Sequence, residues 1–459
     1  TRIRVPSVLV RAGYGWAEFV EHRFCTSEAE LARFYRNLGH WLAVMRLLGG
    51  TDLHSENLIA HGPVPVVVDV ESLFAPDPPV PPAERGLAVD LAAKAIRGTV
   101  LRTGLLPVRS EGPGLGGLDI SAAGSLPGQQ PRVPAPLIVG GGTDRARLGM
   151  TLLERPHAKN HPSPDPVLAR HWDQVVEGFH ELTARMKTLD AHGGLRPLLE
   201  PFTGAVVRRI LRPTQTYAEL LRMLWHPASL YDAPRAHARA REVLRKNAGV
   251  SPGAPSTTSV IDEELADLCV GDIPVFTQPV TRRVLDGTLE AWRSVDESLE
   301  EMTIQSTLIS AYLNEKTVPP RVPAPATPAR RERLDARRRA QLSKLVRRVS
   351  DAAVRGPDGT ATWISPVLAE FGWAVRPLSA EHYSGQGGVA VVLAQYLREV
   401  RHGRADAVEG LPELLEGTLA VLRATEDRVP VKSPGGFAGL ASQVWIWSTL
   451  HDLGTVPGA

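Results

Sequence analysis

The chain has 459 residues, of which 43% are hydrophobic and 22% are charged. This length is typical of about two or three domains, and the composition excludes a disordered or membrane-embedded chain. The 52 basic and 50 acidic residues leave a net charge of +2, which is too small to indicate a nucleic-acid or anionic-lipid partner. No apolar run reaches the roughly 18 residues of a membrane span, and the start lacks a signal-peptide pattern, so we expect a cytoplasmic protein.

Two residue types are scarce. The two cysteines, Cys25 and Cys269, cannot form a disulfide framework or a multi-cysteine metal site, and they fit a reducing compartment. Only seven of the 52 basic residues are lysines, and the first of them is Lys94. Because the chain begins with Thr1 rather than Met, we expect it to be processed or to be a fragment that lacks N-terminal residues.

Hydrophobic periodicity predicts a mainly helical chain with one small β element. Residues 27–48 place leucines and aromatic residues at helical spacing after Ser27, and this pattern ends at two glycines. Residues 57–71 contain β-rich runs on both sides of a His-Gly-Pro turn, which predicts a hairpin. Further amphipathic helices are predicted over residues 167–189, 206–224, 287–313, 335–354 and 386–400.

Proline and glycine clusters mark the expected connections. Residues 75–85 predict a stiff surface loop, and the long stretch 105–142 predicts a functional loop. Residues 318–328 have the polyproline character of a spacer between domains.

The segment between the first helix and the hairpin has the layout of a phosphotransfer site. Protein kinases carry a catalytic-loop Asp, a metal-binding Asn five positions later, a hairpin and a second metal-binding Asp. Asp52, Asn57 and Asp69 follow this order, accompanied by His54 and Glu71. The residues alone leave open a simpler interpretation, in which Asp52 and Asn57 cap a turn and Asp69 ends a strand. The usual His-Arg-Asp lead-in is absent, so this is not an ordinary protein kinase.

Residues 50–74 (GTDLHSENLIAHGPVPVVVDVESLF) resemble the signature of the dehydratase domain of class II lanthipeptide synthetases, the LanM type. Segments 13–25, 208–221 and 271–277 agree with this resemblance, which covers nearly the whole chain. It implies an α+β, mainly helical fold with a lipid-kinase-like catalytic lobe, followed by the first helices of an α/α toroid.

The resemblance implies ATP-dependent dehydration of Ser and Thr in a ribosomally made precursor peptide with a leader. The residue is first phosphorylated and its phosphate is then eliminated, with Mg-ATP as cofactor and ADP present for elimination. The implied catalytic residues are Asp52, His54, Arg208 and Thr214, and the implied nucleotide and metal site consists of Asn57, Asp69 and Glu71, with Asn57 and Asp69 as Mg²⁺ ligands. Arg212 is a further phosphate-binding candidate, because the fork of an arginine suits a phosphate.

The C-terminal part resembles the opening helices of a LanC-type cyclase, a toroid whose zinc activates precursor thiols. The matching segments are 361–364, 381–397 and 435–454. Gly387 and Gly388 open either a tightly packed helix or an ordinary glycine loop. No Cys follows Cys269, so we predict no zinc site in this chain and zinc only in a full-length cyclase domain.

Two domains and a linker follow from these resemblances. Residues 1–316 are the expected dehydratase region without its N-lobe, 317–334 a Pro/Arg-rich linker, and 335–459 the start of the cyclase domain. A kinase-like site also needs a lysine upstream of the catalytic loop, and none precedes Lys94, so we expect the chain alone to bind ATP poorly. The alternatives are a small-molecule or lipid phosphotransferase without elimination, and an inactive truncated remnant.

Overall fold

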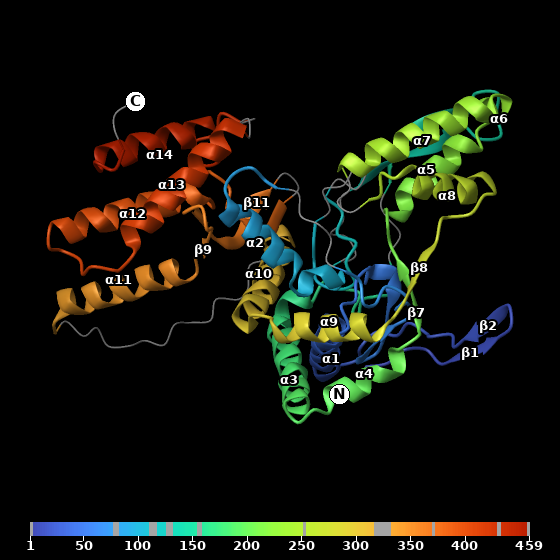
Figure 1. The fold of residues 1–459 in the computed structure, drawn as a ribbon, viewed down its shortest axis with the longest axis horizontal. Helices are drawn as coiled ribbons and strands as arrows, with labels where there is room; N and C mark the ends of the chain where they lie inside the picture. The colour runs from blue at the N-terminus through green and yellow to red at the C-terminus, as the bar shows by residue number, and fades with distance from the viewer. Residues whose placement is uncertain are drawn as a thin grey trace. The chain divides into compact units, whose positions relative to one another are not determined.

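The computed structural model describes residues 3–76, 82–109, 117–124, 132–153, 158–250, 254–315, 332–369, 372–428 and 433–456. The chain forms two compact units. The first contains residues 1–81, 102–105 and 174–297, and the second contains 82–101, 106–173 and 298–459. The fold is mostly helical with small antiparallel sheets, as predicted (Figure 1). Among the described helices, none has the length and apolar character that a bilayer crossing requires.

The first unit is built around α1 (Glu28–Leu47), which confirms the helix predicted over residues 27–48. It begins where the Ser27 side chain accepts a hydrogen bond from the Glu30 amide, and acidic residues in its first turn complement the helix dipole. Its inner face is buried and includes Phe34, Leu38 and Leu42. The helix therefore provides the rigid support for the segment that follows it.

Two glycines let α1 pack closely on α3 (Trp172–Ala191), the helix predicted over residues 167–189. A Cβ at Gly39 would lie 2.2 Å from the Val175 carbonyl oxygen, and one at Gly178 would lie 2.1 Å from the Arg36 carbonyl oxygen. Backbone meets backbone at this crossing, so a side chain at either glycine would force the helices apart.

The predicted hairpin is confirmed as β3 (Leu58–His61) and β4 (Val64–Val67), with Leu58 opposite Val67. Its two-residue turn contains Gly62 at a φ of +56°, a conformation that favours glycine. Two carbonyls of the hairpin, those of Pro63 and Pro65, accept hydrogen bonds of 3.0 and 2.9 Å from the Asn37 and Trp41 side chains of α1. These bonds fix the hairpin against the helix.

The other helices and strands of the first unit surround this core or extend from it. They are β1 (Val8–Arg11), β2 (Tyr14–Ala17), α4 (Leu195–Leu199), β7 (Val206–Arg209), α5 (Thr214–Leu224), α6 (Pro227–Tyr231), α7 (Ala233–Val250), α8 (Thr258–Cys269), β8 (Phe276–Pro279) and α9 (Arg282–Arg293), with short 3₁₀ turns at Ser55–Asn57 and Glu200–Phe202. Of a further 3₁₀ turn, Val100–Thr103, the last two residues belong to this unit. Helices α5, α7 and α8 lie side by side (Figure 1) and share one apolar cluster.

Two helix predictions were wrong in detail. Residues 206–224 form a strand followed by a helix, because β7 pairs with β8, with Val206 opposite Pro279 and Arg209 opposite Phe276. The partner strand lies far along the chain, so local periodicity could not reveal it. Residues 287–313 belong to two helices, α9 and α10 (Glu297–Glu315). The expectation of one β element was also wrong, since six two-stranded sheets occur among the described residues.

The second unit consists of α10 and a set of helices and short strands. They are α2 (Leu87–Arg97), β5 (Val133–Val139), β6 (Arg147–Leu153), α11 (Leu334–Asp351), β9 (Val354–Arg355), β10 (Ala361–Thr362), β11 (Ile364–Ala369), β12 (Gly372–Pro377), α12 (Gln386–Arg401), α13 (Leu411–Arg428) and α14 (Leu440–Asp452), with a 3₁₀ turn at Leu168–Arg170. Helices α11 and α12 confirm the predictions over 335–354 and 386–400.

Some connections fall outside the described residues. The long loop expected over 105–142 contains the whole of strand β5, while residues 110–116 and 125–131 of it are not described. The spacer over 318–328 and most of the expected linker over 317–334 also lie outside them. The predicted domain limits stay a prediction.

Gly387 and Gly388 open a tightly packed helix, as one of the two interpretations expected. They lie in the first turn of α12, where a Cβ at Gly387 would be 2.2 Å from Ile446 Cδ1 of α14. A Cβ at Gly388 would be 2.4 Å from the His382 carbonyl oxygen. A Cβ at Gly387 would also lie 2.8 Å from the Ala380 carbonyl oxygen, so both positions face backbone that leaves no room for a side chain.

Candidate functional site

The predicted catalytic loop runs from Thr51 to Asn57, between α1 and β3. Asp52 has a φ of +66°, a left-handed conformation that aspartate tolerates better than most residues. Both neighbours are fixed: the Thr51 amide donates to the Ser72 carbonyl at 3.0 Å, and the Leu53 amide donates to the Thr103 carbonyl at 2.8 Å. The surrounding backbone therefore holds Asp52 in a strained conformation, a feature common at functional sites.

Hydrogen bonds within the loop orient His54 and Asn57. The Asn57 amide nitrogen Nδ2 donates to the Asp52 carbonyl at 2.9 Å, which leaves the side-chain oxygen Oδ1 for another partner. The His54 Nδ1 accepts from the Glu56 amide at 3.3 Å. In the neutral ring, this bond places the proton on Nε2.

The hairpin returns the chain to the loop, where Asp69 and Glu71 follow β4. The Val68 amide donates to the Asn57 carbonyl at 2.9 Å, so Asp69 lies directly after a residue bonded to the catalytic loop. The Glu71 amide donates to Asp69 Oδ1 at 3.0 Å, which fixes this carboxylate.

Strand β7 brings Arg208 to the same place. Its amide donates to the Glu71 carbonyl at 2.9 Å, and its guanidinium forms an ion pair with the Glu71 carboxylate. The predicted residues Asp52, His54, Asn57, Asp69, Glu71 and Arg208 are thus brought together by three segments distant in sequence.

The charges of the neighbouring side chains act on the pKa of Asp52. Burial raises the pKa of the Asp52 carboxyl above its ordinary value, and the carboxylates of Asp69 and Glu71 raise this pKa further. His54 and Arg208 act in the opposite direction and lower the pKa. Asp52 and Glu71 nevertheless remain exposed to solvent, and Asp69 is half-buried. Three carboxylates therefore lie near one another at the surface of the unit, and their mutual repulsion favours a bound cation.

The donor set fits Mg²⁺. Asn57 and Asp69 supply oxygen atoms, which hard cations prefer, and Mg²⁺ in phosphotransfer sites is usually held by one or two carboxylates plus substrate phosphates. No group of three or more His, Cys, Asp or Glu side chains suited to a metal occurs among the described residues. A site that completes its coordination with phosphate oxygens and water does not need such a group.

Thr214 is placed apart from this hydrogen-bonded set. It is the first residue of α5, and it is exposed to solvent. Its assigned role in elimination stays a prediction.

Arg212 does not serve as a phosphate-binding residue, which corrects the expectation from sequence. Its side chain is fully buried and forms an ion pair with Glu264 at 2.7 Å. All five guanidinium N–H groups are used, with acceptors on Glu264, Leu244, Asn247 and Pro255. An arginine with every donor occupied by protein has none left for a ligand.

Sequence reasoning missed other arginines near the site. Arg46, Arg102, Arg209 and Arg283 come from four different segments and line one pocket. Arginine is abundant throughout this chain, and only the adjacency of Arg209 to Arg208 could have signalled that it lies near the site.

Two comparisons bear on the origin of these features. The chain is 35% identical over 95 residues to the "Lacticin 481/lactococcin biosynthesis protein LcnDR2" of Lactococcus lactis subsp. lactis. This match covers 21% of the chain and 10% of the relative, so the matched region is about a tenth of the relative's length. Residues 1–278, which include every predicted site residue, match the family described as "Domain of unknown function (DUF4135)". With more than half of its length in this match, the chain belongs to the DUF4135 family.

Proposed function

We propose that the protein acts in lanthipeptide biosynthesis, as the part of an enzyme that dehydrates Ser and Thr in a ribosomally made precursor peptide. The observation that carries this proposal is the convergence of Asp52, Asn57 and Asp69 with the Arg208–Glu71 pair in one region. The resemblance of residues 50–74 to lanthipeptide dehydratases and the relative named for lacticin 481 biosynthesis support it.

In the first half-reaction, a hydroxyl of the peptide takes the γ-phosphoryl group of ATP. Asp52 is the group that orients this hydroxyl and accepts its proton, which is the role of the Asp at this position in kinase-like sites. The pKa of its carboxyl is raised, which brings this pKa closer to the value that suits a general base at neutral pH. Asn57 and Asp69 are the residues that would hold Mg²⁺, which would supply positive charge against the phosphates.

In the second half-reaction, the phosphorylated residue loses its α-proton and its phosphate. A general base takes the α-proton, the electrons of the Cα–H bond form a Cα=Cβ double bond, and the Cβ–O bond breaks. The products are a dehydro residue, inorganic phosphate and the protonated base. Arg208 stabilises the departing phosphate, because its guanidinium is partly exposed and forms a single ion pair with a described residue. Thr214 is assigned to the same step by the family resemblance.

Mass spectrometry of a precursor peptide co-expressed with the complete open reading frame tests this proposal. We expect the peptide to lose the mass of one water for each modified residue. Asp52→Asn abolishes modification, whereas Arg208→Gln leaves a phosphorylated peptide that is not dehydrated. Arg282→Gln, an exposed arginine on α9, is the matched control and preserves dehydration.

Two results contradict the proposal. An unmodified peptide beside a well-folded protein would exclude the reaction. A phosphorylated end product that Arg208→Gln does not change would instead indicate a phosphotransferase without elimination.

A further inference from the structure

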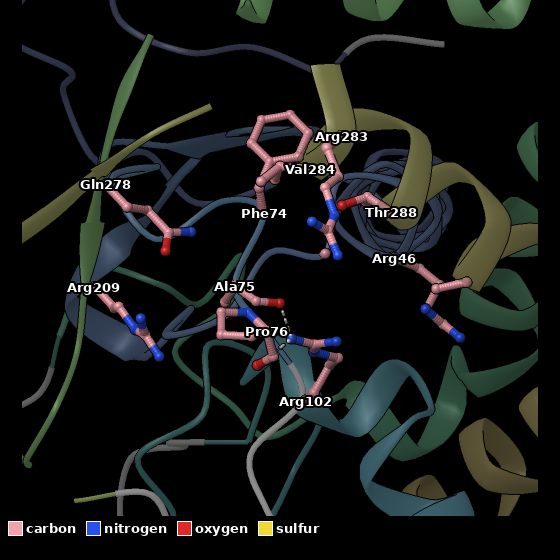
Figure 2. A pocket seen from close by; sticks show the side chains of 13 residues that line it. Arg46, Phe74, Ala75, Pro76, Arg102, Arg209, Gln278, Arg283, Val284 and Thr288 are labelled. Carbon is pink, nitrogen blue, oxygen red and sulfur yellow. Dashed lines mark hydrogen bonds between the residues drawn. The ribbon is translucent and has the colours of Figure 1, made fainter. Parts of the chain in front are cut away.

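A pocket of about 430 Å³ opens in the first unit. Its walls come from the end of α1, the residues after Glu71, the sheet of β7 and β8, and α9 (Figure 2). Four arginines line it, Arg46, Arg102, Arg209 and Arg283, and we call it the arginine pocket. Pockets of roughly 300–1,000 Å³ are the usual size for small-ligand sites.

The lining of the arginine pocket carries only positive charge. No Asp or Glu occurs among the described residues that form it; the rest of the wall is apolar or neutral, with Phe74 and Val284 on one side. Figure 2 shows the guanidinium groups of Arg102, Arg209 and Arg283 directed into the pocket from three different segments. Like charges gathered in this way repel one another, so an anion is the occupant that the pocket favours.

A second pocket of the same unit shows the contrast. It has a volume of about 500 Å³ and is lined by Arg36, His40 and Glu181 among others. There, Arg36 pairs with Glu181 at 3.0 Å, and the same carboxylate lies 3.3 Å from His40 Nε2. The charges of that pocket are compensated within the protein. By contrast, the side chains of Arg209 and Arg283 form no hydrogen bond or ion pair with the residues that the structure describes.

The arginine pocket is also linked to the candidate site through the backbone. Arg102 donates to the Ala75 carbonyl at 2.6 Å, and the carbonyl of the next residue, Thr103, accepts from the Leu53 amide beside Asp52. Arg209 directly follows Arg208, whose amide is bonded to Glu71. The pocket and the catalytic loop are therefore built on the same strands and turns.

We propose that the arginine pocket binds a phosphoryl group, carried by a phosphoserine or phosphothreonine of a peptide or present as free inorganic phosphate. The guanidinium fork matches two phosphate oxygens, and several forks can bind one dianion from different sides. The apolar wall at Phe74 and Val284 accommodates carbon atoms next to the phosphate. The inference goes beyond the proposed function, in which Arg102, Arg209 and Arg283 have no role.

Calorimetry with the 459-residue chain tests the inference with three ligands: a phosphoserine peptide, the same peptide with serine, and inorganic phosphate. We expect the phosphorylated ligand to bind and the serine peptide not to bind. Arg283→Gln weakens binding about tenfold or more, as expected for the loss of a charge-assisted hydrogen bond. Arg282→Gln is the matched control, since Arg282 is the neighbouring exposed residue on α9, pairs with Glu200 at 3.2 Å and does not line the pocket.

The three ligands distinguish the source of the phosphate. Tighter binding of the phosphopeptide identifies a peptide, and equal binding of inorganic phosphate that competes with it identifies the free ion. Binding that Asp52→Asn keeps and Arg283→Gln loses supports the pocket, whether or not the protein dehydrates any peptide.

Three outcomes overturn the inference. The first is that neither the phosphoserine peptide nor inorganic phosphate binds. The second is an equal loss of affinity in Arg282→Gln and Arg283→Gln. The third comes from a fourth ligand, the same peptide with aspartate in place of phosphoserine, if it binds as tightly as the phosphoserine peptide. Circular dichroism of both variants establishes that they fold, and neither exposed side chain supports the core.

Discussion

Arg208 and Arg212 lie four residues apart in the chain but in opposite surroundings. Arg212 is 2% exposed and enclosed by α5, α7 and α8, where its five donors are all occupied. The guanidinium of Arg208 in β7 lies near enough to Asp52 to lower the pKa of its carboxyl, and among the described residues it bonds to Glu71 alone. The difference teaches that an arginine alone does not identify a phosphate site. What matters is how many of its guanidinium N–H groups remain available to a ligand.

The surroundings of Arg212 explain why it is structural. A charge removed from water is tolerated only when it is paired and its other hydrogen-bonding groups are satisfied. Glu264 is itself fully buried and also accepts a hydrogen bond of 2.7 Å from the Tyr217 hydroxyl. Burial and this bond raise the pKa of the Tyr217 hydroxyl. Together, Arg212, Tyr217 and Glu264 link α5 to α7 and α8 through polar contacts inside an apolar cluster.

Loss of the buried guanidinium has the largest expected effect on stability. Arg212→Met leaves the Glu264 carboxylate buried without its partner, so we expect the free energy of unfolding to fall by about 3–5 kcal/mol. Urea denaturation followed by circular dichroism measures this change. The control is Arg222→Met, an exposed arginine of α5, which should change stability by at most about 0.5 kcal/mol. Similar values for both variants would contradict the structural role of Arg212.

A second change should restore part of that loss. In the double variant Arg212→Met with Glu264→Gln, the buried charge is gone and the Gln side-chain oxygen can still accept the Tyr217 hydroxyl. We expect it to recover about 2 kcal/mol relative to Arg212→Met, because the unpaired charge causes most of the loss. A double variant that is less stable than Arg212→Met would show that the loss of stability comes from the packing of these side chains and not from the unpaired charge.

The partly exposed arginine should behave differently. Arg208→Gln removes an ion pair that remains in contact with solvent, so we expect stability to change by about 1 kcal/mol or less. Its thermal unfolding should therefore stay close to that of the unchanged protein while elimination is lost. A large loss of stability would remove the distinction between the two arginines.

The same two arginines show what the sequence could predict. Residues 27–48 and the hairpin after residue 57 have patterns that act over a few residues, and both predictions were confirmed. The order of Asp52, Asn57 and Asp69 predicted that they converge, because a hairpin must return the chain to the loop. Such features depend on neighbours in the chain.

The remaining features depend on partners that are distant in sequence. Residues 206–209 form a strand because β8 lies beside them, and a periodicity window over 206–224 does not contain that strand. Arg212 is buried because Glu264 and two helices enclose it. An arginine at position 212 is compatible with a buried or an exposed environment, so the residue type alone does not predict which one it has. The arginine pocket likewise gathers four segments whose sequences share no spacing.

The charge of Asp52 provides a smaller test of the site itself. Because its pKa is raised on folding, the native protein binds the proton more tightly than the unfolded chain does. Stability therefore falls as the pH rises from the ordinary Asp value of about 3.8 to the raised native value, and the full penalty persists above it. Asp52→Asn should remove this slope and retain the left-handed backbone, which asparagine also tolerates.

Neighbouring residues make the Asp52 test specific. Asp69 raises the pKa of Asp52, so Asp69→Asn should narrow the pH range over which stability falls. Arg208→Gln should widen this range, since Arg208 lowers the same pKa. Urea denaturation across this pH range, compared among the three variants and the unchanged protein, measures both shifts. Parallel curves for all four proteins would mean that the carboxylates do not interact, and the convergence that supports the catalytic assignment would be lost.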